Sequence, residues 1–101
     1  MACCEMKGYL SYLILWILRK KRMNGAQIGR ELEKRRGTKP SPGTIYPALK
    51  ELKNTGLITV DTDKIYSLTN NGEEKLITAC KFFCHIFYDM EEMSDFCKTS
   101  E

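Results

Sequence analysis

The sequence predicts a small, mainly α-helical fold with one β-hairpin and a further helix at its C-terminal end. Three helical patterns follow one another up to residue 54, two strand-like runs follow at residues 57–60 and 65–68, and a long helical pattern begins near residue 70. Because 101 residues can enclose only a modest core, we expect association with a second copy to bury further surface.

The first predicted helix covers residues 7–19, and residues 1–6 are expected to form a loose lead-in. A helix that is apolar on most sides must be buried on most sides. One small domain can hardly cover all of it, so we expect a partner subunit to cover its aromatic line; the alternative is a core helix of a monomer. The inward line is Leu10, Leu13, Ile14, Ile17 and Leu18, and the aromatic line is Tyr9, Tyr12 and Trp16.

The second and third predicted helices are separated by a short turn. Asn24 and Gly25 mark the break after the first helix, the second helix runs over residues 26–36, and residues 37–40 form a Gly/Pro turn. The third helix begins near Ser41, a residue type that caps helices, and Pro42 suits the first helical position. Its apolar face is Ile45, Ala48, Leu49 and Leu52, and residues 54–56 end it.

Two strands follow the third helix at once. Residues 57–60 and 65–68 are rich in β-branched and aromatic side chains, and residues 61–64 between them supply a tight turn. Two helices, a short turn, a third helix with a polar face and then a hairpin make a winged helix-turn-helix. The tip of the wing carries Asp61, Asp63 and Lys64, so we expect it to add little affinity for phosphates.

The last helical pattern runs from about residue 70 to Met93. Apolar residues recur along it with spacings of 4, 3, 4 and 3, which is a heptad line, and a second apolar line lies on another face. We expect one line to pack on the chain's own domain and the other on a partner. Residues 1–71 would then form a DNA-binding domain and residues 72–101 a dimerisation helix and tail. The heptad line is Leu76, Cys80, Phe83, Phe87 and Met90; the second is Ala79, Phe82, Ile86 and Met93.

The charges are divided between the two parts of the chain. Residues 1–60 carry twelve Lys or Arg and four Asp or Glu, for a net charge of +8, whereas residues 61–101 carry four and nine, for −5. The basic half contains the third predicted helix, which could fit the major groove of DNA. This predicts a polyanionic partner, namely double-stranded DNA.

The cysteines indicate a reducing setting. There are five, an odd number without the spacing of small secreted domains, so we expect a cytoplasmic protein. The apolar run at residues 9–18 is too short to cross a bilayer, which takes about 20 residues. Cys80, Cys84 and His85 could belong to a metal or redox-sensing site. A four-ligand metal site would need further ligands, from Cys97 or from a partner subunit. Their spacing matches no closed zinc pattern, so we expect neither metal nor cofactor.

The stretch SPGTIYPALKELKNTGLI, residues 41–58, is closely similar to the recognition-helix signature of PadR-type transcriptional regulators. MNG at 23–25 with Ile28, and YSLT at 66–69 followed by NG at 71–72, extend the resemblance over residues 7–76. It implies a cytoplasmic homodimeric repressor whose last helix packs across onto the partner's first helix. Two departures are Asn24 and Ala26, where the family usually has a His and an aromatic, and a wing shorter than is common.

Eight residues are the candidates for DNA contact. Lysines and hydroxyls on this helix suit phosphates and base edges. Pro47 removes a backbone hydrogen bond, at a typical cost of about 3 kcal/mol, and we interpret it as shaping the helix end that enters the groove; a tolerated kink is the alternative. The set is Thr38, Lys39, Ser41, Thr44, Tyr46, Pro47, Lys50 and Lys53.

The functional hypothesis is a dimeric, sequence-specific transcriptional regulator that represses by occluding a pseudo-palindromic operator. The alternative is a winged helix that acts as a protein-interaction module without specific DNA binding. An enzyme is disfavoured, because the sequence holds one His, no nucleophile–base pair and no phosphate loop. Trp16 at the expected dimer interface could line a pocket for a small aromatic effector, with core packing as the default.

Overall fold

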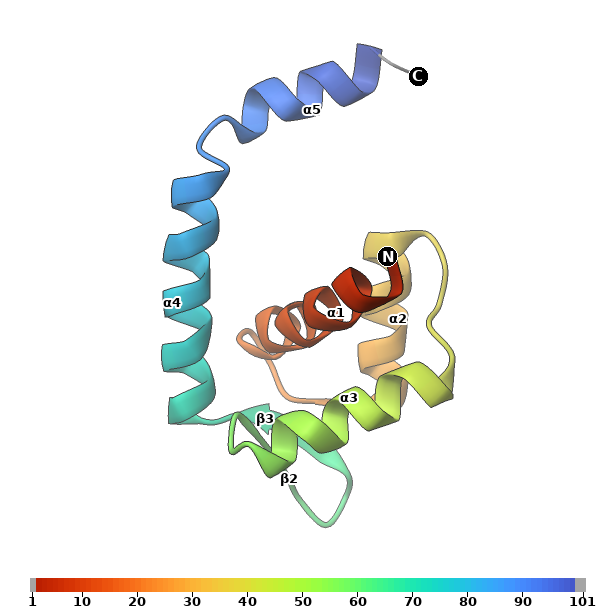
Figure 1. Cartoon of the computed structure of the whole chain (residues 1–101). Coiled ribbons are helices and arrows are strands. Elements are labelled where there is room, and N and C mark those ends of the chain that lie inside the picture. Colours follow the sequence, from red (N-terminus) through yellow and green to blue (C-terminus); the bar gives the residue numbers. More distant parts are fainter. Residues whose placement is uncertain (1, 100–101) are drawn as a thin grey trace.

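The computed structural model describes the backbone of residues 2–99 and, within that range, the side chains of residues 10–98. Three helices pack over a small sheet, a fourth helix stands along one side of them, and a fifth turns away from its end (Figure 1). The elements are α1 (Ala2–Leu18), β1 (Met23–Asn24), α2 (Gly25–Arg36), α3 (Pro42–Asn54), β2 (Ile58–Val60), β3 (Ile65–Leu68), α4 (Asn70–Ile86) and α5 (Met90–Thr99).

The core lies where α1, α2, α3 and the sheet meet. The side chains with the least solvent contact come from each of these elements, which confirms that the inward faces of all three helices converge on one core. They are Ile14, Ile28, Leu32, Leu49 and Ile58. Leu13, expected on the inward line, is only half-buried, whereas Leu15 is buried.

The sheet has three strands rather than the two of the expected hairpin. Its order is β1-β3-β2, with both pairs antiparallel. β2 and β3 pair Ile58 with Leu68 and Val60 with Tyr66, as a hairpin should, and β1 adds Met23 on the other side of Tyr66. The mainly α winged-helix fold is therefore confirmed, with one short strand added.

Asn24 joins this added strand to α2. Its side-chain oxygen accepts from the N–H of Gln27 at 2.8 Å, and the Gln27 side chain accepts from the N–H of Asn24 at 2.9 Å. This reciprocal pair is a capping box, which satisfies two backbone donors at the start of a helix. The predicted break at Asn24 and Gly25 is therefore the start of α2 itself.

The expected loose lead-in is wrong. α1 begins at Ala2, and residues 2–6 are helical. None of these five residues is Gly or Pro, so nothing in the local sequence ends the helix before residue 7.

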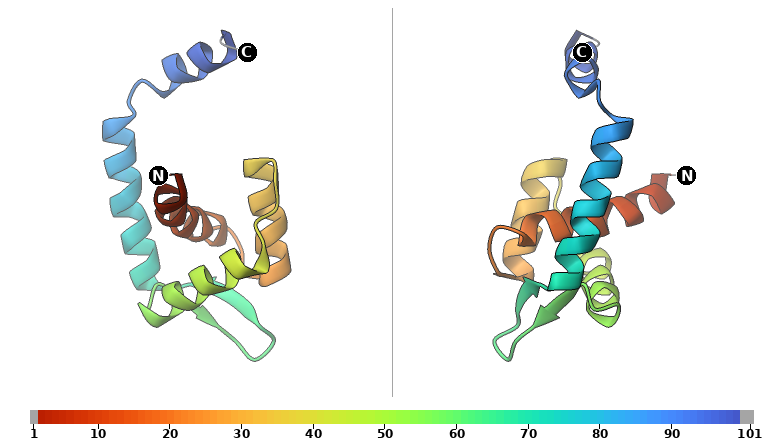
Figure 2. Two further views of the ribbon diagram at one scale, coloured as in Figure 1. Left: turned by 45° about the vertical axis from the view of Figure 1, so that its right-hand side comes forward. Right: turned by 90° about the vertical axis from the view of Figure 1, so that its left-hand side faces the viewer.

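A single helix up to Met93 is also wrong, because α4 ends at Ile86. Phe87 has φ −107° and ψ 46°, which lie outside the helical region, although its N–H still reaches the carbonyl of Phe83 at 2.7 Å. The carbonyl of Asp89 then accepts from the N–H of Met93 at 3.0 Å and so begins α5. Asp is among the favoured residues at this position, and Glu91 and Glu92 suit the first turn. The two views in Figure 2 show α5 turned away from the axis of α4.

Thr69 and Gly72 fix where α4 starts. The Thr69 hydroxyl accepts from the N–H of Gly72 at 3.0 Å and donates to the carbonyl of Gly56 at 2.7 Å. The N–H of Thr69 donates to the carbonyl of Leu57 at 3.1 Å. These bonds tie the start of α4 to the end of α3, so the direction of α4 depends on the winged helix beneath it.

Candidate nucleic-acid interface

α3 has one buried face and one exposed face. Ile45, Leu49 and Leu52 are at most 4% exposed, and this anchoring presents the opposite face to solvent. All eight residues expected to contact DNA are exposed side chains of α3 or of the turn before it.

The N-terminus of α3 differs in detail from the expectation. Ser41 occupies the cap position, with φ −71° and ψ 157°, but its side chain does not cap the backbone. Its carbonyl accepts from the N–H groups of Thr44 at 2.9 Å and Ile45 at 3.0 Å. Its hydroxyl lies 3.2 Å from the Thr44 hydroxyl. The two hydroxyls therefore form a polar pair at the positive end of the helix dipole, an arrangement that suits a phosphate.

The exposed residues of α3 form more than one line along the helix. With 3.6 residues per turn, Gly43, Pro47, Lys50 and Asn54 follow one another on the side opposite the core. Thr44 lies on one flank of this line. Asn54 was expected only to help end the helix, yet the helical spacing places its amide, a group that can read adenine, beside Lys50.

Tyr46 is packed against the start of α2. A Cβ atom at Gly25 would lie 2.6 Å from the Tyr46 hydroxyl oxygen, so the ring occupies space that only glycine leaves open. The ring is still 50% exposed. Burial, and then the charge of Tyr46, raise the pKa of Tyr66. Tyr46 thus bridges α3 and α2, with its hydroxyl beside a helix N-terminus that favours anions.

Lys39 and Pro47 are positioned by the backbone around them. The Lys39 side chain passes over Gly29, since a Cβ atom there would lie 3.3 Å from its Cε atom. The Lys39 ammonium group extends from an exposed side chain. Pro47 lies inside α3 without ending it, and because proline has no N–H it cannot donate to the carbonyl of Gly43.

The wing uses one of its acids to form its own turn. The Asp61 carboxylate accepts from the N–H groups of Asp63 and Ile65, each at 2.9 Å. Lys64 takes a positive φ of 63°, and its N–H donates to the carbonyl of Asp61 at 3.0 Å. The predicted tight turn is confirmed, and Asp61 has a structural role that its charge alone did not indicate.

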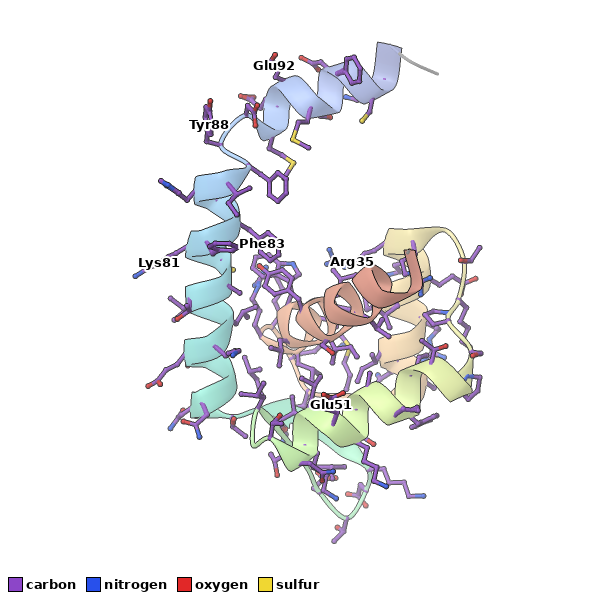
Figure 3. All side chains as sticks on the ribbon, viewed as in Figure 1. Arg35, Glu51, Lys81, Phe83, Tyr88 and Glu92 are labelled. Carbon is purple, nitrogen blue, oxygen red and sulfur yellow. The ribbon has the colours of Figure 1, made fainter. Side chains whose placement is uncertain are left out.

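A second feature lies away from the exposed face of α3, between α1 and α4. The Tyr12 hydroxyl and the Cys80 thiol share a hydrogen bond of 3.1 Å, and the rings of Tyr12 and Phe83 have centroids 4.8 Å apart. Figure 3 shows Lys81 and Tyr88 pointing away from α1. Burial first, and then the bond to Cys80, raise the pKa of Tyr12 to about 12. Arg19 lies 3.7 Å over the ring of Trp16.

These contacts change which residues are available to a partner. Leu76 is 3% exposed and belongs to the core of its own chain, so we remove it from the expected dimer interface. The Tyr9 side chain lies outside the described residues. Further along, large apolar side chains remain exposed on α4, α5 and the turn between them: Ile77, Phe82, Ile86, Phe87, Tyr88, Met90, Met93 and Phe96.

Comparison with known proteins settles the family. The model described as the transcriptional regulator PadR-like family matches residues 14–78 of this chain. The chain belongs to the PadR-like family. The family consists of transcriptional regulators rather than enzymes, and the match covers the end of α1, all of α2 and α3, the wing and the first part of α4.

Solved structures of related regulators share the fold of this PadR-like protein. A PadR-like transcription factor from Bacteroides fragilis has a TM-score of 0.78 and 27% identity over 91% of this chain and 96% of its own. RosR from H. salinarum has a TM-score of 0.71 and 28% identity over 90% and 89%. PadR from Bacillus subtilis, solved in complex with p-coumaric acid, has a TM-score of 0.61 and 38% identity over 66% of this chain and 41% of its own. A search of curated proteins finds no match.

Two further findings bear on other classes of function. Within residues 2–99, no helix of this PadR-like protein is long and apolar enough to cross a membrane. Among the described side chains, no group of three or more His, Cys, Asp or Glu could hold a metal ion.

Proposed function

We propose that this PadR-like protein is a homodimeric repressor that binds a pseudo-palindromic operator and occludes a promoter. The observation that carries the proposal is the division of α3 into a face anchored by Ile45, Leu49 and Leu52 and a face that exposes Tyr46 and Lys50. A rigid helix with exposed hydroxyl, amide and ammonium groups suits the major groove. Its place of action would be the cytoplasm.

Lys50 and Lys53 supply charge, while the hydroxyls at the start of α3 supply position. Lysines that neutralise phosphates release counterions. The logarithm of the association constant therefore falls linearly with the logarithm of the salt concentration, with a slope of roughly −0.9 per phosphate contacted. Thr44, Lys50 and Asn54 are the side chains best placed to meet base edges. The wing, whose Asp61 carboxylate is engaged in its own turn, would add little.

The dimer is supported by the apolar surface that a single chain leaves uncovered. Phe82 is 62% exposed, Ile86 46% and Met90 57%, all on α4 and α5. An apolar surface of this kind is typical of a protein interface. A twofold dimer built on it would set the two copies of α3 about 34 Å apart, so that they meet successive major grooves.

The decisive experiment is selection of bound fragments from a genomic DNA library at physiological salt, followed by affinity measurements on the selected site. We expect a site with two half-sites about one helical turn apart. The double variant Tyr46→Ala/Lys50→Ala should bind it at least roughly tenfold more weakly, with a shallower salt dependence. Lys98→Ala, which removes the same charge from an exposed position on α5, is the matched control.

The outcomes separate the two hypotheses. If no fragment is retained specifically, the chain is a winged helix that binds proteins rather than DNA, with the acidic α5 as its docking surface. If a site is selected and the double variant binds it as tightly as wild type, the proposed recognition surface is wrong even though DNA binding is right.

A small aromatic effector is a further part of the proposal. Tyr12, Trp16 and Phe83 gather on the side of the chain that faces the proposed interface, and aromatic walls suit flat ligands. The complex of Bacillus subtilis PadR with p-coumaric acid supports this reading for a related protein.

A further inference from the structure

Two free thiols share the aromatic pocket. The pocket is an open space of about 240 Å³ between α1, α4 and the end of α2, away from the DNA face of α3. Its lining residues are Tyr12, Leu13, Trp16, Arg35, Cys80, Phe83 and Cys84. The pocket therefore combines flat apolar walls, the guanidinium of Arg35 and two thiols. Two of its lining residues, Arg35 and Phe83, are labelled in Figure 3.

The two thiols have different surroundings. Cys80 is half-buried and holds its hydrogen bond with Tyr12 at 3.1 Å. Cys84 is exposed, and it follows Cys80 by one helical turn on the same side of α4. In the single chain the sulfur of Cys84 is therefore open to a molecule in the pocket.

We propose that this pocket captures planar, thiol-reactive rings of the quinone class, with Cys84 as the nucleophile. The aromatic walls favour a flat ring over an aliphatic electrophile, because offset and edge-to-face ring contacts are attractive. Arg35 supplies a permanent positive charge that can face the oxygen on which negative charge develops. A merely apolar ligand would use neither the thiol nor the guanidinium.

The reaction needs no other reagent. The Cys84 thiol loses its proton to water, and the thiolate sulfur forms a bond to a ring carbon of the quinone. The electron pair of the attacked C=C bond moves through the ring to a carbonyl oxygen, which becomes an oxyanion beside Arg35 and takes a proton from water. The proton on the attacked carbon then passes through water to the second oxygen. The product is a hydroquinone thioether: the quinone is reduced, the sulfur and ring carbon are joined, and no atom leaves.

Such an adduct would act on the contact that joins α1 to α4. Tyr12 of α1 meets Cys80 and Phe83 of α4 at the floor of the pocket. A ring attached one turn further along α4 would wedge against Trp16 and change how α4 leaves the winged helix. This consequence for DNA binding rests on the proposed function, whereas capture of the quinone does not.

The test compares two reagents on the whole protein. The protein is treated without oxygen with one equivalent of 1,4-naphthoquinone or of iodoacetamide, and the labelled cysteine is located by peptide fragmentation. Cys97 is the internal control, because it is also exposed but lies on α5 outside the pocket. For each reagent the measured quantity is the ratio of labelling at Cys84 to labelling at Cys97. We expect this ratio to be at least roughly five times higher with the quinone than with iodoacetamide, since only the quinone gains ring contacts.

A pair of arginine variants tests the guanidinium. Arg35→Gln should slow the quinone at Cys84 several-fold and leave the iodoacetamide rate unchanged. Arg30→Gln, on the exposed surface of the same helix and outside the pocket, should change neither rate. The proposal would be overturned if the ratio of labelling at Cys84 to labelling at Cys97 were the same for both reagents. It would also be overturned if Cys84 reacted with neither reagent. Because labelling is measured without DNA, failure here leaves the regulator hypothesis standing, and the reverse also holds.

Discussion

The hydroxyl of Tyr46 on α3 lies so close to Gly25 on α2 that a Cβ atom at position 25 would be 2.6 Å from its oxygen. This contact connects the exposed side of α3 to the capped start of α2, where Asn24 and Gln27 form their reciprocal bonds. The glycine is therefore favoured by the present position of a neighbouring side chain rather than by its own backbone angles.

Replacing Gly25 with Ala should weaken DNA binding more than it weakens folding. The obstructing atom is the end of a half-exposed side chain, which can turn away, so we expect the free energy of unfolding to change by less than about 1 kcal/mol. Displacement of the hydroxyl should cost the proposed hydrogen bond to phosphate, on the order of 1.5–3 kcal/mol. Affinity measured by fluorescence anisotropy should then fall by roughly tenfold to a hundredfold.

The control for this experiment is Tyr46→Phe, which removes the hydroxyl and leaves position 25 unchanged. If both variants act through one hydroxyl, the double variant should bind little worse than either single variant. Additive losses would show that Gly25 acts on DNA binding by another route.

The exposed apolar face of α4 leads to a prediction about assembly. Phe82→Ser/Ile86→Ser should convert the proposed dimer into a monomer, because both side chains are about half-exposed or more and would be covered only by a partner. Sedimentation velocity at micromolar concentration measures the change. Tyr88→Ser is the matched control: Tyr88 is 84% exposed and points away from the other helices in Figure 3. A wild-type monomer, or a double variant that remains a dimer, would contradict the prediction.

The sequence predicted the parts of the fold that depend on local signals. Pro42 at the start of α3, Gly56 with φ +80° just after its end, and the polar turn at 61–64 each determine the backbone near them. The same holds for the candidate interface: its five residues on α3 are exposed because they alternate with the buried positions of that helix, and the other three lie in the turn before it.

The features that the sequence did not predict depend on distant partners or on competing local signals. β1 has two residues and exists only because Tyr66, more than forty positions away, pairs with Met23. The break between α4 and α5 contains no Gly or Pro, and the heptad spacing continues through it. The signal beside this break is Asp89, a residue type that favours the start of a helix, and it is weak compared with the apolar repeat. The contact of Tyr46 with Gly25 likewise joins two helices whose relative placement no local pattern gives.

Gly72 should be the glycine at which alanine is least tolerated. A Cβ atom there would overlap the carbonyl oxygen of Leu57, and backbone cannot turn away as a side chain can. We expect Gly72→Ala to lower the free energy of unfolding by roughly 1–3 kcal/mol, as overpacking does. Gly43→Ala is the control, since its Cβ would meet only the Ser41 Oγ, at 3.7 Å. That change should stabilise α3 by up to about 1 kcal/mol. Urea denaturation at one fixed protein concentration compares them, and equal effects would contradict the close approach.

The contact between Tyr12 and Cys80 predicts how stability depends on pH. The pKa of Tyr12 is raised from 10.0 to about 12, chiefly by burial and then by the hydrogen bond with Cys80. The folded chain therefore holds this proton more tightly than the unfolded chain. The contribution of the Tyr12 hydroxyl to the free energy of unfolding is fully present below the pKa of the unfolded chain. This contribution is lost as pH rises towards the pKa of the folded chain. Wild type should lose stability more steeply than Tyr12→Phe between about pH 10 and about pH 12. Tyr66, whose pKa burial also raises, is present in both proteins and cancels in the comparison. Urea unfolding across this range measures the difference, and a difference that stays constant with pH would show that Tyr12 ionises as freely in the folded protein as in the unfolded chain.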